Sequence, residues 1–269
     1  MRLRGLRPAL IGLTVAAAVV VGVALSPPAR SSITVPGHLA SFGQTTTIGA
    51  LFTLSSSGQL QNHFCTASVV DSPAGDLAVT AAHCMQGQQA DQVAFVPDYS
   101  AGREPYGVWT VTSVIEDHQW RESGDADDDF AFLVVDQAGS TVPLEDLTGG
   151  EMLGISAPPG RSVKVAGYPD TASTIVSCNN TVVAFSPTQF EFDCDGFTDG
   201  TSGSPLLAEA IPAGATGEAA TDGIDMVIGV IGGYEQGGYT PSVSYAARFA
   251  ANFAALYQRA LLVSAGSGG

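Results

Sequence analysis

Basic side chains are scarce in this sequence. Its 269 residues include 10 Lys and Arg against 26 Asp and Glu, which gives a net charge of -16. Nucleic-acid binding requires a positive field and Lys or Arg contacts to phosphate, so DNA and RNA are excluded as partners. Charged residues make up only 13% of the chain and hydrophobic residues 45%, a composition too apolar for a disordered protein.

Long apolar runs are absent after residue 25. No later run reaches the roughly 18 residues of a membrane helix, so we expect the body of the chain to lie outside the membrane. The length suffices for one large domain or two small ones with a buried core. Glycine is abundant, with 32 residues. This glycine-rich, charge-poor composition favours many short strands and turns over helices.

The first 29 residues have the three parts of a secretory signal. They are a basic start with three arginines, an apolar stretch over residues 9–25, and the small-residue exit Ser26-Pro27-Pro28-Ala29. An uncleaved membrane anchor is the alternative, but 17 apolar residues are marginal for a bilayer and two prolines follow at once. We therefore predict a signal peptide over 1–29, a secreted protein, and an N-terminal segment over 30–42. Removal of the signal would change the net charge to about -19.

Four cysteines, Cys65, Cys84, Cys178 and Cys194, remain after such cleavage. Outside the cell an even number of cysteines indicates disulfides, and four cysteines allow three connectivities. We favour the sequential pairs Cys65–Cys84 and Cys178–Cys194, because each then closes a loop over a plausible hairpin. None of the cysteines has the CxxC or CxxH spacing of a zinc site, so we predict no metal.

Two series of short β-rich segments follow the N-terminal segment. The first covers residues 48–54, 65–70, 78–81, 92–96, 108–115 and 130–135. The second covers residues 162–166, 174–177, 182–185, 189–192, 205–207 and 226–231. Gly, Pro, Ser and Asp separate the segments, and this spacing indicates a barrel or a sandwich. We expect two similar β units joined near residues 138–155.

The end of the chain has a different pattern. Apolar residues recur at three- and four-residue steps, as on one face of a helix: Tyr245, Phe249, Phe253, Leu256, Tyr257 and Ala260. We predict a packed helix over 244–263 and a flexible tail over 264–269. Residues 210–223 have the composition of a surface loop between two strands.

Three motifs contain residue types used in nucleophilic catalysis. His83 ends the small-residue run Val79-Thr80-Ala81-Ala82 and precedes Cys84, so a disulfide could hold its imidazole rigidly, as a general base requires. Asp129 precedes the apolar segment Phe130–Leu133, where a carboxylate could orient a histidine ring. Ser202 lies between glycines in Gly200-Thr201-Ser202-Gly203-Ser204-Pro205, a tight turn that exposes a hydroxyl for attack on a carbonyl.

The motifs VTAAHC, DFAFL and GTSGSP, in the chain order His, Asp, Ser, resemble those of the chymotrypsin-like secreted serine endopeptidases. The resemblance is to the bacterial trypsin-like and glutamyl-endopeptidase-like branch, in which GxSGSP replaces GDSGGP. It spans roughly residues 43–262. It implies an all-β fold of two six-stranded antiparallel β-barrels, over 43–143 with His83 and Asp129 and over 144–243 with Ser202, followed by a C-terminal α-helix. It also implies a Cys65–Cys84 bridge, protein or peptide substrates, a monomer and no cofactor.

The resemblance also implies a role for each motif residue. Ser202 would be the nucleophile, His83 the general base, and Asp129 the carboxylate that orients His83. The backbone N–H groups of Gly200 and Ser202 would form the oxyanion hole. Asp125, Asp127 and Asp128 compete with Asp129 for the orienting role. Asp129 is preferred because only it directly precedes the apolar strand, whereas the others fit a solvated acidic turn. A calcium-binding loop over residues 125–129 is a further alternative, but this acidic run lacks the glycine and distal glutamate of an EF-hand.

Two positions depart from the family pattern. Family members activated by a freed N-terminus bury that amine against an aspartate just before the nucleophile, and Thr201 stands there. We therefore expect no such switch, with the oxyanion loop held by local hydrogen bonds and the Cys178–Cys194 bridge. Trypsin-like members carry an acidic residue six positions before the nucleophile, where this chain has Gly196.

Other residues could shape the pocket for the substrate. Asp195 and Asp199 flank Gly196, and either could reach a basic substrate side chain or be solvated. The histidine that glutamate-selective members often use is absent at Val230 and Ile231. The opposite wall is expected to consist of Gly232, Gly233 and Tyr234. The expected substrate-binding residues are thus Gly196, Asp199, Gly232, Gly233 and Tyr234.

Two other functions fit the sequence less well than a serine endopeptidase. A catalytically weak or inactive protein with the protease fold, which binds other molecules, is the first alternative, but such proteins lack a triad member and all three are present here. A lipase or esterase needs the order Ser, Asp, His, and no histidine follows Ser202. The sequence thus predicts a secreted serine endopeptidase.

Overall fold

The computed structural model describes residues 38–39, 46–209 and 225–267. The expected signal peptide, most of the N-terminal segment over 30–42, and the expected surface loop over 210–223 lie outside the described residues. No helix in the described part of the chain is both long and apolar enough to cross a bilayer.

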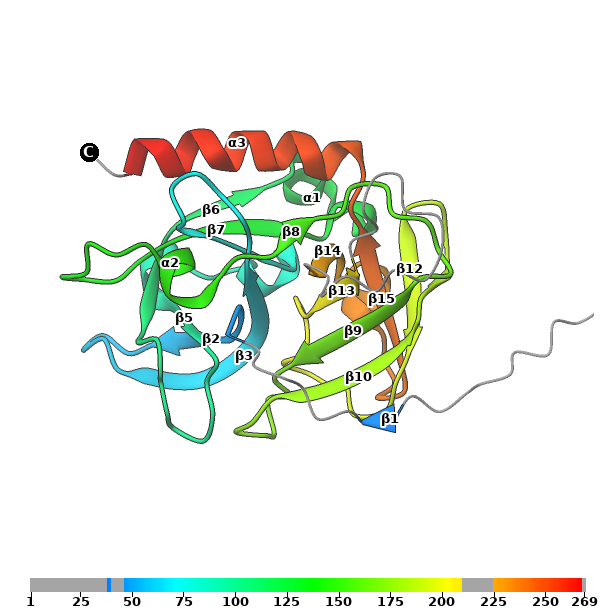
Figure 1. Ribbon diagram of the computed structural model, residues 1–269, viewed down its shortest axis with the longest axis horizontal. Helices are drawn as coiled ribbons and strands as arrows, with labels where there is room; N and C mark the ends of the chain where they lie inside the picture. Colours follow the sequence, from blue (N-terminus) through cyan, green and yellow to red (C-terminus); the bar gives the residue numbers. More distant parts are fainter. Residues whose placement is uncertain (1–37, 40–45, 210–224, 268–269) are drawn as a thin grey trace, which may run out of the picture. The chain divides into compact units, whose positions relative to one another are not determined.

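Six strands of the first half form a closed antiparallel barrel (Figure 1). They are β2 (Ile48–Leu54), β3 (Leu60–Val69), β4 (Leu77–Thr80), β5 (Val93–Pro97), β6 (Trp109–Glu116) and β7 (Ala131–Asp136), and the barrel runs in the order β2-β3-β4-β7-β6-β5. Each of the six segments predicted from the first series overlaps one of these strands.

The central strands of this barrel are apolar because both of their faces are covered. All four residues of β4 are buried, and so are the first five of β7. One face of these strands lies in the barrel interior, and the other packs against the second half of the molecule and the C-terminal helix. One buried cluster accordingly contains residues of both halves, among them Val79, Phe132, Val230 and Phe253.

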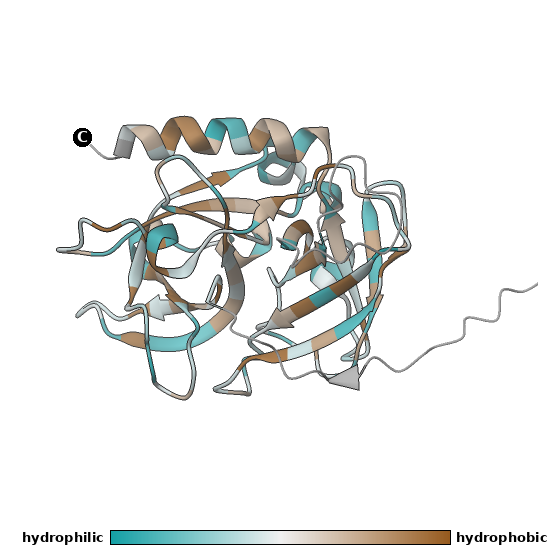
Figure 2. Cartoon of the chain, in the orientation of Figure 1, coloured by the Kyte–Doolittle hydropathy of each residue, from teal (hydrophilic) through white to brown (hydrophobic). Residues whose placement is uncertain are grey.

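The second half is a curled nine-stranded sheet. Its six longer strands are β9 (Ser162–Gly167), β10 (Val176–Thr181), β12 (Gln189–Asp193), β13 (Pro205–Glu209), β14 (Asp225–Ile231) and β15 (Val243–Arg248). Three two-residue strands join them: β1 (His38–Leu39), β8 (Met152–Leu153) and β11 (Val183–Ala184). Hydrophilic and hydrophobic residues alternate along β9 (Figure 2), as expected for a strand with one solvated face.

The all-β chymotrypsin-like fold is confirmed, and the second half differs from a closed six-stranded barrel in one respect. Its strand order is β1-β10-β9-β13-β14-β15-β12-β11, with β8 beside β14, so backbone pairing does not close the ring. Side chains instead link β10 to the end of β12, the strands next to the two ends of this order. Cys178 on β10 forms a disulfide with Cys194, which follows β12, and Asn180 donates a hydrogen bond to the carbonyl of Asp193 at 2.6 Å.

The C-terminal helix α3 spans Ala251–Ser267, so the predicted helix over 244–263 began too early. Residues 243–248 form strand β15, which pairs with β12 and β14. The apolar spacing continued from Tyr245 on the strand to Phe253 on the helix, and this continuity hid the boundary. The predicted flexible tail over 264–269 was wrong for 264–267, where the Ser264 hydroxyl donates to Asp76 at 2.5 Å.

Helix α3 lies along β6 and β7 of the first barrel (Figure 1). Phe253 contacts the rings of Phe130 and Phe132, each with 5.0 Å between ring centroids. Two shorter helices, α1 (His118–Ser123) and α2 (Leu144–Thr148), lie in connections. Four 3-10 turns complete the described structure: η1 (Ala82–Met85), η2 (Ala90–Gln92), η3 (Ala126–Asp128) and η4 (Tyr234–Gly237).

Candidate active site

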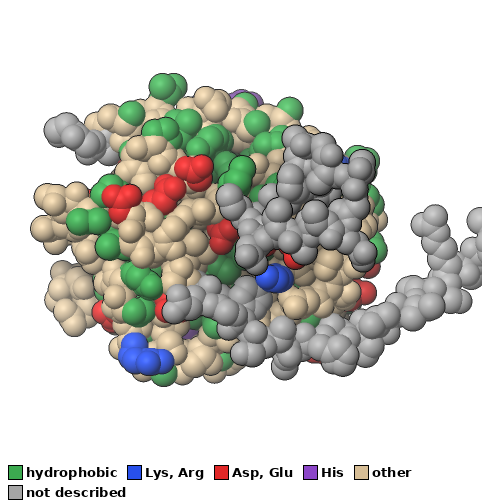
Figure 3. Space-filling view, in the orientation of Figure 1, with side chains coloured by type: hydrophobic (Ala, Val, Ile, Leu, Met, Phe, Trp, Pro, Cys, Tyr) green, Lys and Arg blue, Asp and Glu red, His purple; other side chains and the backbone are tan. Residues whose placement is uncertain are grey.

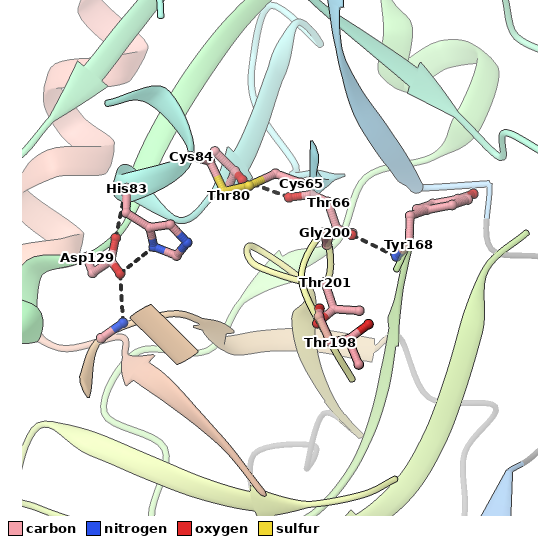
Figure 4. Close-up of a disulfide and its surroundings, with 11 residues drawn as sticks. Cys65, Thr66, Thr80, His83, Cys84, Asp129, Tyr168, Thr198, Gly200 and Thr201 are labelled. Carbon is pink, nitrogen blue, oxygen red and sulfur yellow. Dashed lines mark hydrogen bonds and ion pairs between the residues drawn. A yellow bond between two sulfur atoms is a disulfide. The ribbon is translucent and has the colours of Figure 1, made fainter. Parts of the chain in front are cut away.

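His83 lies on η1, directly after the buried strand β4 (Figure 4). Its neighbour Cys84 forms a disulfide with Cys65 on β3, with 6.1 Å between the Cα atoms. The bridge joins the turn to the barrel wall, and the His83 side chain is 10% exposed. Strand, turn and disulfide thus fix the imidazole while leaving part of it accessible.

Asp129 is fully buried and receives three hydrogen bonds. Its Oδ1 accepts the backbone N–H of His83 at 2.8 Å, and its Oδ2 lies 2.7 Å from His83 Nδ1. Oδ2 also accepts the backbone N–H of Gly233 at 2.8 Å. Three donors stabilise the ionised carboxylate, which in turn requires a proton on Nδ1. The other ring nitrogen, Nε2, then carries a lone pair.

The three competing aspartates each have another partner. Asp125 accepts the N–H of Asp127 at 3.1 Å, Asp127 accepts the side-chain amide of Gln189 at 2.7 Å, and Asp128 accepts that of Asn252 at 2.5 Å. Burial raises the pKa of Asp128 above its ordinary value. The structure therefore brings Asp129, and none of these three, to His83. Among the described residues, the one group spaced for a metal is Cys65, His83 and Cys84, and its sulfurs form the disulfide.

Ser202 lies on a turn of the second half that packs against the first barrel. Gly203 has a φ of 83°, and a Cβ there would collide with the carbonyl of Thr66 and the hydroxyl of Thr80. It would also lie 3.1 Å from the N of Ala81, two residues before His83. Ser202 itself is partly exposed. Among the described residues, His83 has its one ring hydrogen bond through Nδ1 to Asp129, and none joins the ring to the Ser202 hydroxyl.

Two backbone N–H groups of this turn have no backbone acceptor among the described residues. Thr201, Gly203 and Ser204 donate within the protein, whereas Gly200 and Ser202 donate no backbone hydrogen bond in the described part of the chain. The carbonyl before each free N–H is held: the Asp199 carbonyl accepts the N–H of Asp170 at 2.8 Å, and the Thr201 carbonyl accepts that of Ser204 at 3.0 Å. Because a peptide is planar and trans, holding its carbonyl directs its N–H the opposite way.

Thr201 is buried and stabilises the turn locally. Its hydroxyl donates to the carbonyl of Thr198 at 2.7 Å, and its N–H donates to the same oxygen at 3.0 Å. These bonds are of the local kind expected for a chain with threonine in place of the family's aspartate.

The expected substrate-binding residues separate into two groups. Gly232 and Gly233 lie beside the His83–Asp129 pair: a Cβ on Gly232 would be 2.9 Å from Asp129 Oδ2, and Gly233 donates to that oxygen. Tyr234 follows them and is 40% exposed. Gly196 and Asp199 are exposed residues of the segment that leads to Ser202.

Asp199 also lines a cavity of about 380 Å³ with Phe197 and Tyr239. Tyr239 is 81% exposed and was not anticipated from the sequence. Two buried polar residues were also missed. Gln189 accepts the N–H of Tyr234 at 2.7 Å, and Thr66 binds the Ser202 turn. Thr66 directly follows Cys65, and this position was the one signal that could have identified it.

Residues 65–210 match the model of a family described as trypsin-like peptidase domain. The structure is similar to that of the protease Anisep from Arthrobacter nicotinovorans, with 25% identity, a TM-score of 0.66, and coverage of 82% of this chain and 98% of that chain. The thermostable serine protease AL20 from an extremophilic microorganism has 24% identity, a TM-score of 0.63, and coverage of 81% and 98%.

A Glu endopeptidase solved with MPD has 15% identity, a TM-score of 0.62, and coverage of 84% of this chain and 97% of that chain. At this level of identity the likeness concerns the fold. No curated protein matches the chain in sequence.

Proposed function

The chain belongs to the trypsin-like peptidase family, and on that basis we propose that it is a secreted serine endopeptidase. The observation that carries the proposal is the buried Asp129 carboxylate bonded to His83 Nδ1, which leaves Nε2 as a base beside the Ser202 turn.

In the proposed reaction the Ser202 hydroxyl attacks the carbonyl carbon of a peptide bond while His83 Nε2 takes its proton. Asp129 stabilises the imidazolium that forms. The tetrahedral intermediate carries a negative oxygen, which the N–H groups of Gly200 and Ser202 would bind. Each such donor contributes on the order of 10²- to 10³-fold in rate. The C–N bond then breaks, and the amine leaves with the proton from His83.

The second half of the reaction repeats these roles. The acyl group is bonded to Ser202 Oγ, and water replaces the departed amine. His83 takes a proton from the water, which attacks the ester, and returns the proton to Ser202 as the acid leaves. No cofactor is required at any step.

We propose that the oxyanion turn is preformed and needs no freed N-terminus. The bonds from Thr201 to Thr198 support this proposal, because they hold the turn from within. The Cys178–Cys194 bridge is the second proposed support of the turn, because it joins two strands of the sheet that carries the turn. Activity that appears only after proteolytic trimming of the secreted protein would contradict it.

The proposed partners are protein or peptide substrates, bound by a monomer that acts outside the cell. The disulfides fit an oxidising compartment. Lys and Arg side chains are few on the face shown in Figure 3, in line with the exclusion of nucleic acid. The proposed substrate-binding surface comprises Gly196, Asp199, Gly232, Gly233 and Tyr234.

A fluorophosphonate probe tests the proposal, because it bonds covalently to an activated serine. We expect the secreted protein to be labelled and Ser202→Ala to remain unlabelled, with the same result for cleavage of a peptide library. An unlabelled wild-type protein that is correctly folded would favour the alternative, an inactive protease-fold binding protein. Equal labelling of both proteins would exclude Ser202 as the nucleophile.

A further inference from the structure

Thr66 on β3 of the first barrel binds the turn of the second half that carries Ser202 (Figure 4). We propose that Thr66 is a positioning residue that fixes the orientation of the two oxyanion-binding N–H groups. This inference rests on the serine endopeptidase function proposed above and extends it to a residue with no direct contact to the substrate.

Thr66 makes three hydrogen bonds to backbone of the second half. Its N–H donates to the carbonyl of Ser202 at 2.8 Å, and its hydroxyl donates to the carbonyl of Gly200 at 3.0 Å. The same hydroxyl oxygen accepts the N–H of Tyr168 at 2.9 Å. Thr66 is fully buried, so water does not compete for these bonds.

The hydroxyl acts on the peptide between the two free N–H groups. This peptide joins Gly200 to Thr201; its carbonyl is held by Thr66 and its N–H by the carbonyl of Thr198. Gly200 has a φ of 90° and no side chain, so its own conformation resists rotation weakly. With both ends of the peptide bonded, rotation would break two hydrogen bonds in a buried site. The angle between the two N–H groups is therefore set from the first barrel.

Adjacent residues of β3 thus position both parts of the proposed site. Cys65 holds the turn of His83 through the disulfide, and Thr66 holds the turn of Ser202 through hydrogen bonds. The base and the oxyanion turn belong to different halves of the molecule. A single strand that binds both turns keeps them in register.

The test is Thr66→Val, which keeps the shape of the side chain and removes the hydroxyl. The change leaves the Gly200 carbonyl and the Tyr168 N–H unpaired in a buried site, and the peptide can then rotate to find other partners. Since loss of one oxyanion donor costs 10² to 10³ in rate, misorientation should lower kcat by about 10- to 100-fold. The hydrogen bonds from the two N–H groups to the substrate oxygen form in the transition state and not in the ground state. KM should therefore change by less than about threefold.

A second measurement follows the tetrahedral state directly. The affinity for a peptide boronate, which forms a tetrahedral adduct with the serine, should fall in parallel with kcat/KM. Thr66→Ser keeps the hydroxyl and should retain kcat within about threefold of wild type, since only a methyl group is lost.

Thr148→Val is the matched control, because it also removes a buried threonine hydroxyl, bonded to the Leu144 carbonyl at 3.1 Å in α2. It should lower stability and leave kcat unchanged.

The proposal is overturned if Thr66→Val keeps wild-type kcat, or if Thr66→Ser loses as much kcat as Thr66→Val does. Should Thr66→Val not fold, Thr66→Ala is compared with Thr66→Ser, and equal kcat values for that pair overturn it. A wild-type protein that the fluorophosphonate does not label contradicts the proposed function instead.

Discussion

Asp129 holds His83 at two points. One carboxylate oxygen accepts the backbone N–H of His83 at 2.8 Å, and the other lies 2.7 Å from the ring Nδ1. The first contact fixes the turn and the second fixes the ring and its tautomer. Gly233 adds a third bond to Asp129 from the second half of the molecule, so the position of the His83–Asp129 pair depends on both halves.

Asp129→Asn should inactivate the protein by changing the tautomer. An amide nitrogen opposite Nδ1 would donate to it and place the ring proton on Nε2, which then cannot act as a base. We expect kcat to fall by about 10⁴-fold, as this change does in the serine protease triad. Steady-state cleavage of a peptide at saturating concentration measures the effect. Asp125→Asn, which changes a neighbouring carboxylate bonded to Asp127, should stay within about twofold of wild type. Equal losses in the two variants would show that charge, and not this contact, matters.

Gly203→Ala should disrupt the packing of the Ser202 turn on the first barrel. Gly203 has a φ of 83°, and its Cβ would overlap the Thr66 carbonyl and the Thr80 hydroxyl. We expect both a loss of stability and a fluorophosphonate labelling rate at least about tenfold lower, because the turn must shift. Gly87→Ala is the control, with a φ of 75° and open space around it. It should cost about 1 kcal/mol of stability and leave labelling unchanged. Normal labelling of Gly203→Ala would argue against close packing at this point.

Much of the fold, and the contact between His83 and Asp129, could be predicted from the sequence because the signals are local. The strand before His83, the cysteine beside it, and the apolar strand after Asp129 are visible within a few residues. The strand β15 was missed for a physical reason. Its buried residues and those of α3 form one continuous apolar series, and only pairing with β12 and β14 shows where the strand ends.

Contacts between the two halves could not be predicted in this way. Gly233 as a donor to Asp129, and Thr66 as a donor to Gly200, join residues more than 100 positions apart. Neither residue type indicates a partner, since glycine and threonine occur throughout the chain. Such contacts depend on how the two sheets pack, which periodicity within one segment does not specify.

Removing the two disulfides should separate stability from activity. Cys178→Ala with Cys194→Ala removes the covalent link between β10 and the end of β12 in the second sheet. Cys65→Ala with Cys84→Ala removes the link between β3 and the turn of His83. The bridges join residues 16 and 19 positions apart, so each loss should cost about 3 kcal/mol. Thermal unfolding measures this cost. At temperatures where both variants are folded, the pair without the Cys65–Cys84 bridge should lose more kcat. The reverse order of kcat would contradict the assigned role of that bridge.

The stability of the protein should depend on pH through Glu151. Burial raises the pKa of this carboxyl, although the Thr47 hydroxyl donates to it at 2.7 Å. The folded state therefore holds the proton more tightly than the unfolded state does. Stability from this group is complete below the unfolded pKa and is lost as pH rises through the folded pKa.

Glu151→Gln keeps an acceptor for Thr47 and removes the charge. At pH 4 the two proteins should unfold at similar temperatures, and at pH 8 the variant should unfold about 1 to 4 °C higher. The difference in unfolding temperature should grow as pH rises through the raised pKa of Glu151, and calorimetry at several pH values would measure it. Glu104→Gln is the same change at an exposed carboxylate, and its difference in unfolding temperature from wild type should not grow with pH. Two outcomes would contradict this prediction: a difference in unfolding temperature that does not change with pH, or a Glu151→Gln variant less stable than wild type at pH 8. Burial alone must penalise the charge, so either outcome would mean that the surroundings of Glu151 stabilise its ionised carboxylate.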